Sequence, residues 1–104
     1  MEITKTKQSV SRLTEKGVQI QLHAIVGGDM EVVTPVGNID ILTHTEIIEI
    51  KEAKAWKNAI GQLLTYGYYY PNHQKRLHLF GKCHHSALIL IRQHCDLNNI
   101  VVTY

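Results

Sequence analysis

The spacing of apolar residues along the chain predicts three helices. Each of these segments repeats apolar side chains at intervals of three or four residues, so one face of each helix would be buried. The first helix begins after Thr14, a residue type that caps helices, and ends at a pair of glycines. The predicted helices cover residues 15–26, 53–67 and 86–95.

Five shorter segments are rich in β-branched residues, which is typical of strands. They cover residues 30–34, 39–43, 46–51, 76–80 and 100–104. The residues 35–38, with the sequence PVGN, predict a tight turn between the first two strands. The order of elements is αβββαβαβ, which predicts an α/β domain.

The third predicted strand, with the sequence EIIEIK, carries two charged residues inside an apolar run. In an extended segment Ile48 and Ile50 point to one face of the sheet, while Glu49 and Lys51 point to the other. Charges at such a position cost free energy unless they are paired, solvated or bound to an ion.

Strand pairing brings a second acid to the same place. If His44 and Thr45 form a two-residue turn, Asp40 lies directly opposite Glu49, although His-Thr is not a favoured sequence for such a turn. Two carboxylates at this distance repel each other, and a divalent cation would reverse the sign of that interaction. The alternative is that Lys51 and surface water neutralise the two acids.

Length and composition predict one globular domain over residues 1–104. The chain has 44% hydrophobic residues, a net charge of +2 and a pI of about 8.6, which permits a polyanionic partner without requiring one. It has no apolar run near the roughly 20 residues of a spanning helix and no apolar signal segment at its start. We therefore expect an intracellular protein without a membrane partner, cytoplasmic or, in a eukaryotic host, nuclear.

Histidines and cysteines cluster at residues 83–85 and 94–95, at the two ends of the third predicted helix. A helix of about ten residues spans roughly 15 Å, so one zinc ion cannot collect ligands from both clusters. Cys95 is better interpreted as a small buried side chain.

Two motifs resemble a known family. Asp40 followed by Glu49-Ile50-Lys51 is similar to the D…(D/E)-x-K signature of the PD-(D/E)XK, or restriction-endonuclease-like, nuclease superfamily. Gln62-Leu-Leu-Thr-Tyr66, in the helix after that strand, resembles the Q-x-x-x-Y motif of the recombination and repair exonuclease branch. The resemblance covers residues 15–81, and it departs from the family pattern in having Ile39 where the family often has proline.

The resemblance implies a fold, a cofactor and a reaction. The fold would be an αβββαβ core with a central mixed sheet flanked by helices, followed by a C-terminal helix and strand. Asp40, Glu49 and the carbonyl oxygen of Ile50 would hold Mg²⁺ or Mn²⁺ beside a DNA phosphodiester, where the cation polarises the phosphoryl oxygen. Lys51 would assist the attacking water. Gln62 would lie near the metal, and Glu15 would hold a water or a second metal from the first helix.

The same resemblance implies a DNA substrate or ligand, with RNA not excluded. Basic and aromatic side chains near the predicted site would contact phosphates or bases. These residues are Lys54, Lys57, Tyr66, Lys75 and Arg76. A domain this small covers little duplex, so we expect a homodimer or larger homo-oligomer, formed through the apolar edge strand at residues 100–102.

The function expected from these features is a metal-dependent endonuclease or related phosphodiester hydrolase. Two alternatives remain at this point. One is a non-catalytic nucleic-acid-binding module on the same fold, which would bind without Mg²⁺-stimulated nicking. The other is an unrelated structural or interaction domain, whose charged strand end is simply solvated and binds no divalent cation.

Overall fold

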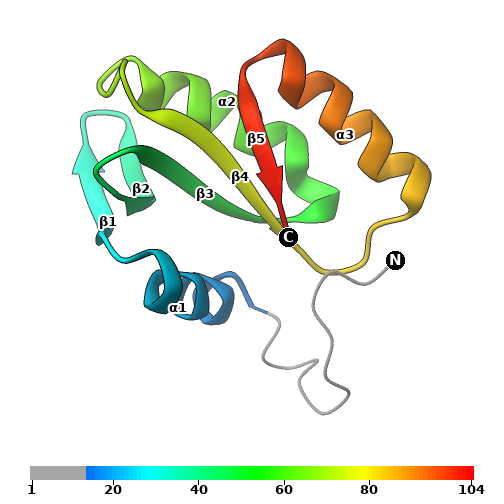
Figure 1. Cartoon of the computed structure of the whole chain (residues 1–104), viewed down its shortest axis with the longest axis horizontal. Coiled ribbons are helices and arrows are strands. Elements are labelled where there is room, and N and C mark those ends of the chain that lie inside the picture. The colour runs from blue at the N-terminus through cyan, green and yellow to red at the C-terminus, as the bar shows by residue number, and fades with distance from the viewer. Residues whose placement is uncertain (1–13) are drawn as a thin grey trace.

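The computed structural model describes residues 14–104, which form a five-stranded mixed sheet with helices on both faces (Figure 1). The strands lie in the order of their sequence, β1-β2-β3-β4-β5. Their bounds are β1 Asp29–Thr34, β2 Gly37–Leu42, β3 Glu46–Glu52, β4 Gln74–Phe80 and β5 Ile100–Thr103. The first three strands form an antiparallel meander, whereas β4 runs parallel to β3 and β5 parallel to β4.

Helix α1, Glu15–Val26, covers one face of the sheet. The Thr14 hydroxyl accepts a hydrogen bond from the N–H of Gly17 at 3.0 Å, and Gly27 ends the helix with a φ of +75°. The buried side chains of this helix contact apolar side chains of β2, β3 and β4. This smaller core consists of Val18, Leu22, Ile41, Ile48, Ile50 and Phe80.

Helices α2, Trp56–Gly67, and α3, His85–Leu97, cover the opposite face. Each follows a strand and returns the chain to the start of the next parallel strand, as expected of a βαβ unit. The larger core lies between these helices and the sheet. Among its fully buried members are Ile39, Ile47, Leu63, Leu77, Leu79, Ile91 and Cys95.

The predicted α/β class and the order of the elements are confirmed. The main difference is at the second helix, where residues Ala53–Ala55 form a 3₁₀ turn and the α-helix begins at Trp56. No side chain caps either start, so apolar spacing alone could not locate the boundary. No helix within residues 14–104 is long and apolar enough to cross a membrane.

Candidate functional site

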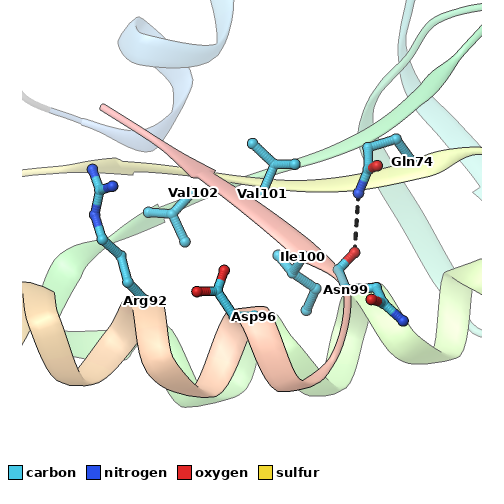
Figure 2. Close-up of a pocket in the computed structure, with 7 residues that line it drawn as sticks. All are labelled: Gln74, Arg92, Asp96, Asn99, Ile100, Val101 and Val102. Atoms are coloured by element: carbon cyan, nitrogen blue, oxygen red, sulfur yellow. Dashed lines mark hydrogen bonds between the residues drawn. The ribbon is translucent and has the colours of Figure 1, made fainter.

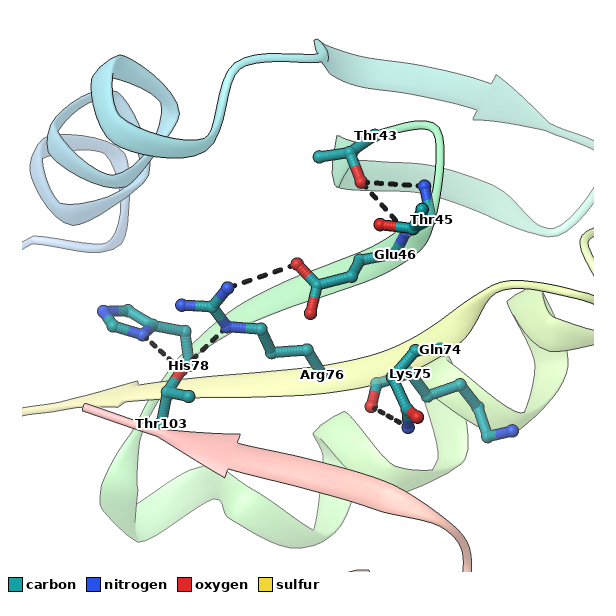
Figure 3. Close-up of polar contacts among 8 residues, drawn as sticks. All are labelled: Thr43, Thr45, Glu46, Gln74, Lys75, Arg76, His78 and Thr103. Atoms are coloured by element: carbon teal, nitrogen blue, oxygen red, sulfur yellow. Dashed lines mark hydrogen bonds and ion pairs between the residues drawn. The ribbon is translucent and has the colours of Figure 1, made fainter.

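The turn between β2 and β3 has two residues, His44 and Thr45, as the predicted register requires. The N–H of Thr43 donates to the carbonyl oxygen of Glu46 at 3.0 Å. The Thr43 hydroxyl accepts from the N–H groups of Thr45 and Glu46 at 3.2 and 2.9 Å (Figure 3). This local cap explains how an unfavoured turn sequence is accommodated.

The register along the two strands confirms the predicted pairing as far as Ile41, which lies opposite Ile48. Beyond that pair the backbone hydrogen bonds between β2 and β3 stop. The side chain of Asp40 then accepts a hydrogen bond that a backbone carbonyl would accept in a regular ladder. Its Oδ2 atom accepts a hydrogen bond from the N–H of Ile50 at 2.8 Å. The carboxylate of Asp40 is therefore held between the two strands, beside Glu49.

Asp40 and Glu49, which we call the acid pair, are both buried. Their exposed fractions are 9% and 2%. Burial raises the pKa of Asp40 to about 6 and that of Glu49 to about 8, and the negative charge of Asp40 adds to the effect on Glu49. The positive charge of Lys51 and backbone hydrogen bonds lower both values, but by less. The pair therefore shares protons at neutral pH when no cation is bound.

An unpartnered oxygen in the acid pair fits a divalent cation. Glu49 Oε1 is buried and has no hydrogen-bond partner among the described residues. Mg²⁺ and Mn²⁺ prefer carboxylate, carbonyl and water oxygens, and Mg²⁺ commonly takes only one or two carboxylates from the protein. Within residues 14–104 there is no group of three or more His, Cys, Asp or Glu side chains around one point. The protein could thus supply two carboxylates and the Ile50 carbonyl, leaving other ligand positions for water or phosphate.

Lys51 lies on β3 two residues after Glu49, and its charge acts on both members of the acid pair. It forms no ion pair with either carboxylate; the ion pairs recorded between residues 14 and 104 involve other side chains. Lys51 is half-buried, and it is close enough for its charge to act on the acid pair.

Helix α2 forms one wall of a hollow of about 410 Å³ next to the acid pair, which we call the α2 groove. It is lined by Val36, Lys57, Asn58, Gly61, Gln62, Thr65 and Tyr66. Asn58, Gln62 and Tyr66 follow one another at intervals of four residues on α2, and all three line this groove. Gln62 carries the second buried oxygen that has no partner among the described residues, its Oε1 atom.

Tyr66 links the groove to the acid pair and also belongs to the core. It is 4% exposed, and its hydroxyl donates to the carbonyl oxygen of Asn38 at 3.0 Å. Burial and the nearby charges of Glu49 and Asp40 raise its pKa. The ring is therefore a packed wall of the site, and its hydroxyl already has a partner.

Two residues that the sequence analysis did not single out complete the surroundings of Asp40. Gln19 of α1 is buried, and its Nε2 atom donates to the carbonyl oxygen of Asp40 at 2.8 Å and to Glu31 Oε2 at 2.7 Å. Glu31 has a φ of +55°, a conformation that is uncommon for a residue with a side chain. The ladder between β1 and β2 pairs Met30 with Ile41 and Val32 with Ile39. Glu31 and Asp40 lie between these two pairs.

Glu15 also acts on the site from α1. Its negative charge contributes to the raised pKa values of both Asp40 and Glu49, so the first turn of the helix lies within electrostatic range of the acid pair. Its side chain is exposed, as expected of an acid in the first turn of a helix.

The residues predicted to contact nucleic acid lie on several elements of the structure. Lys54 is exposed in the 3₁₀ turn before α2, and Lys57 is exposed in the first turn of α2, where it also lines the α2 groove. Lys54 pairs with Glu52 at 3.8 Å, a solvent-exposed contact that contributes little to stability. Lys75 lies against the end of α2, at Gly67.

Arg76 lies on the opposite face of the sheet and does not join the site. Its guanidinium forms an ion pair with Glu46 at 3.2 Å and donates to the Thr103 hydroxyl at 2.9 Å (Figure 3). Thr103 also contacts His78 Nδ1 at 2.7 Å. Burial and the charge of Arg76 lower the pKa of His78 to about 4, so this histidine is neutral at pH 7.

Sequence comparisons identify three relatives in Acanthamoeba polyphaga mimivirus, all named KilA-N domain-containing proteins. The chain is 52% identical to protein L33 over 66 residues, 42% identical to L32 over 79 residues and 46% identical to R878 over 66 residues. These matches cover 64%, 76% and 64% of the chain, but only 27%, 21% and 18% of the relatives. No family model and no solved structure matches the chain.

The chain thus spans about a fifth to a quarter of the length of the relatives it matches. These relatives are named for a KilA-N domain and not as nucleases. The assignment of the chain to the PD-(D/E)XK superfamily is therefore wrong, and so is the main expected function, an endonuclease or other hydrolase in which Lys51 assists an attacking water.

The reason for the error lies in how few positions the two motifs specify. The D…E-x-K and Q-x-x-x-Y patterns fix five residues, and two of these residues have a structural role that explains them without a nuclease site. Asp40 replaces a backbone partner where two strands part, and Tyr66 packs in the core with its hydroxyl bonded to Asn38. Short motifs of this kind do not by themselves establish a family or a reaction.

Proposed function

We propose that this domain is a non-catalytic DNA-binding module. It binds the phosphate backbone through a divalent cation held by the acid pair and through neighbouring lysines. The observation that carries the proposal is the burial of Asp40 and Glu49 together, with a Glu49 oxygen that has no partner among the described residues. Two buried acids raise the free energy of the folded state unless a proton or a cation compensates their charge.

A cation at this place would create an attachment point for a phosphate. Mg²⁺ or Mn²⁺ bound by two carboxylates and the Ile50 carbonyl keeps free coordination positions, which a phosphate oxygen can occupy. The acid pair alone would repel DNA, so binding through this site depends on the cation. Lys51 adds a second positive charge at the same strand end.

The surface around the acid pair suits a polyanion. Lys54 lies in the 3₁₀ turn before α2 and Lys57 in the first turn of α2, and the α2 groove presents the polar side chains of Asn58, Gln62 and Thr65. Lysines near phosphates supply affinity that depends on salt and hardly on sequence. We therefore assign DNA as the partner, with RNA as a related polyanion that the same contacts would accept.

A binding role also agrees with the names of the relatives, which refer to a domain and not to an enzymatic activity. We also propose that the helix, the three-stranded meander, the second helix and the parallel strand are arranged like the core of a restriction endonuclease. This proposal concerns the arrangement of the elements only, and the chain is not assigned to that superfamily. A DNA-binding protein acts inside a cell, in the cytoplasm or in the nucleus of a eukaryotic host.

Fluorescence anisotropy of a labelled DNA duplex of about 20 base pairs, with and without Mg²⁺, tests this proposal. We expect Mg²⁺ to tighten binding of the wild-type protein about tenfold, which corresponds to roughly 1.4 kcal/mol. Asp40→Asn and Glu49→Gln should remove the effect of Mg²⁺. Lys51→Ala should weaken binding and reduce the salt dependence by about one phosphate contact.

Lys82→Ala is the matched control, because Lys82 is exposed at the end of β4 and forms no ion pair with the residues that the structure describes. It should bind like the wild type. If Mg²⁺ did not change the affinity for DNA in the wild type or in any variant, the proposed contact through a cation would be contradicted. Mg²⁺-dependent nicking of a supercoiled plasmid, lost in Asp40→Asn, would contradict the non-catalytic assignment.

A further inference from the structure

The last strand of the sheet, β5, is an edge strand. It pairs with β4 on one side, and no other strand of the described chain pairs with its other side. An edge strand leaves a row of backbone N–H and carbonyl groups available for another strand. The strand has the sequence IVVT, and the side chain of Val101 is 43% exposed.

Helix α3 lies under this edge and shapes a hollow with it (Figure 2). The hollow has a volume of about 420 Å³ and is lined by Gln74, Arg92, Asp96, Asn99, Ile100, Val101 and Val102. Ile89 lies three residues before Arg92, so it belongs to the same stripe of the helix, and it is 47% exposed. Together, β5 and the stripe of Ile89, Arg92 and Asp96 form a surface that we call the β5 edge.

The charges on the β5 edge have a particular arrangement. Arg92 and Asp96 are one helical turn apart and both are exposed, yet neither forms an ion pair with another residue in the described part of the chain. Arg92 is held in place by Tyr104, whose hydroxyl accepts a hydrogen bond at 3.2 Å and whose ring centre lies 5.4 Å from the guanidinium carbon. The stripe therefore presents one positive and one negative group about one turn apart.

This arrangement is self-complementary. In an interface with twofold symmetry, each residue contacts the same patch of the other subunit with the positions exchanged. If two α3 helices lie antiparallel with the axis midway between residues 92 and 96, Arg92 faces Asp96 of the partner subunit. Asp96 then faces the partner subunit's Arg92. The same axis sets two β5 strands antiparallel, which would continue the sheet across the interface.

We propose that the β5 edge is the contact between two copies of this chain in a twofold dimer. The unpaired strand supplies backbone hydrogen bonds, Val101 and Ile89 supply apolar contact, and the two crossed ion pairs set the register. A partner with a different surface would not require Arg92 and Asp96 to complement each other under a twofold rotation. This inference uses a surface apart from the acid pair and does not depend on the proposed DNA binding.

Charge reversal tests the crossed ion pairs in a way that simple loss of stability cannot imitate. The R92D variant carries two acids on the stripe, and the D96R variant carries two guanidinium groups. Each variant alone would repel its own copy, so sedimentation at micromolar to 100 µM concentrations should show self-association weakened roughly tenfold or more. An equimolar mixture of the two variants should recover the dimer, because both crossed pairs are then attractive.

The combined variant R92D/D96R should also dimerise with itself, since the exchange preserves self-complementarity. Lys82→Asp changes charge by the same amount as R92D at an exposed position that does not line the hollow at the β5 edge, and it should leave the dimer intact. A wild-type protein that is monomeric at 100 µM would overturn the proposal. So would dimers that persist in both single variants, or a mixture that fails to recover association while each variant remains folded by circular dichroism.

Discussion

Glu49 is a buried acid that lies next to a second buried acid. Its carboxylate is 2% exposed, faces a second acid, and has one oxygen without a partner. Burial alone raises the pKa of a carboxyl group, and the neighbouring negative charge raises it further. At neutral pH the residue either keeps a proton or binds a cation, and both outcomes can be measured.

The first consequence is a pH-dependent stability of the cation-free protein. The pKa values of Asp40 and Glu49 are raised on folding, to about 6 and about 8, so between about pH 4 and pH 8 the folded state binds more protons than the unfolded state. The stabilising contribution is complete below the unfolded values and is lost as the pH rises through the folded ones. We expect the free energy of unfolding to fall by about 5 kcal/mol from pH 5 to pH 8.

Urea denaturation in EDTA at several pH values measures this loss. Glu49→Gln should flatten the profile, because the amide cannot ionise. Glu52→Gln is the control, since this glutamate lies on the same strand with its side chain 46% exposed. Other charged groups that act on the pair are Glu15, Glu31 and Lys51, and they remain in both variants. A steep profile that persists in Glu49→Gln would place the titrating group elsewhere.

The second consequence concerns the cation. A cation must displace the proton that Glu49 holds near pH 7, so binding should release about one proton per cation. Calorimetry of Mn²⁺ binding in two buffers with different ionisation enthalpies measures this number. The melting temperature should rise with Mn²⁺ in the wild type. It should stay constant in Asp40→Asn, and an equal rise in that variant would exclude the acid pair as the ligand.

At the scale of elements, the hairpin from β2 to β3 shows which features of the site could be predicted from the sequence. Strand alternation and an assumed two-residue turn were enough to place Asp40 beside Glu49, because the side-chain period of a strand is fixed. What could not be predicted is that the strands part at this point and that Asp40 accepts the N–H of Ile50. The loss of a backbone hydrogen bond between two strands depends on their local twist, and the pattern of residue types does not predict that twist.

The role of Gln19 in α1 could not be predicted for a related reason. The amide of Gln19 bridges the backbone of Asp40 and the side chain of Glu31, and a polar position in an amphipathic helix gives no sign of these contacts. A buried amide of this kind is recognisable only when its partners are known. The positive φ of Glu31 is likewise invisible in the sequence, because glycine and asparagine are the usual signals for that conformation.

The connection between α1 and β1 offers a matched test of backbone geometry. Gly27 and Gly28 both have positive φ values, +75° and +85°. A Cβ atom at Gly27 would meet nothing within 4 Å, whereas one at Gly28 would clash with the carbonyl oxygen of Leu42. Gly27→Ala should therefore cost about 1 kcal/mol from conformation alone.

Gly28→Ala should cost clearly more, on the order of 3 kcal/mol, because backbone atoms of β2 must move as well. Chemical denaturation of the two variants under identical conditions measures the difference. Equal losses of stability would show that the contact between Gly28 and Leu42 is not a constraint on how α1 is joined to the sheet.

For the whole molecule, the class and topology followed from the order of elements, but the family did not. A meander, a helix and a parallel strand bring two strand-borne acids and a helix-borne Gln and Tyr together in many possible proteins. The relatives in the mimivirus correct the nuclease assignment, and they also extend well beyond the matched segment. The matches cover 64% to 76% of this chain, which carries the acid pair on one side and the β5 edge on another.

The most direct test of the central claim is a crystal structure of the protein with a short DNA duplex and Mn²⁺, analysed by anomalous scattering. We predict an anomalous peak between the carboxylates of Asp40 and Glu49, with a DNA phosphate oxygen among its ligands and Lys51 beside it. DNA bound to another face, or Mn²⁺ absent from the acid pair in the DNA complex, would contradict the account.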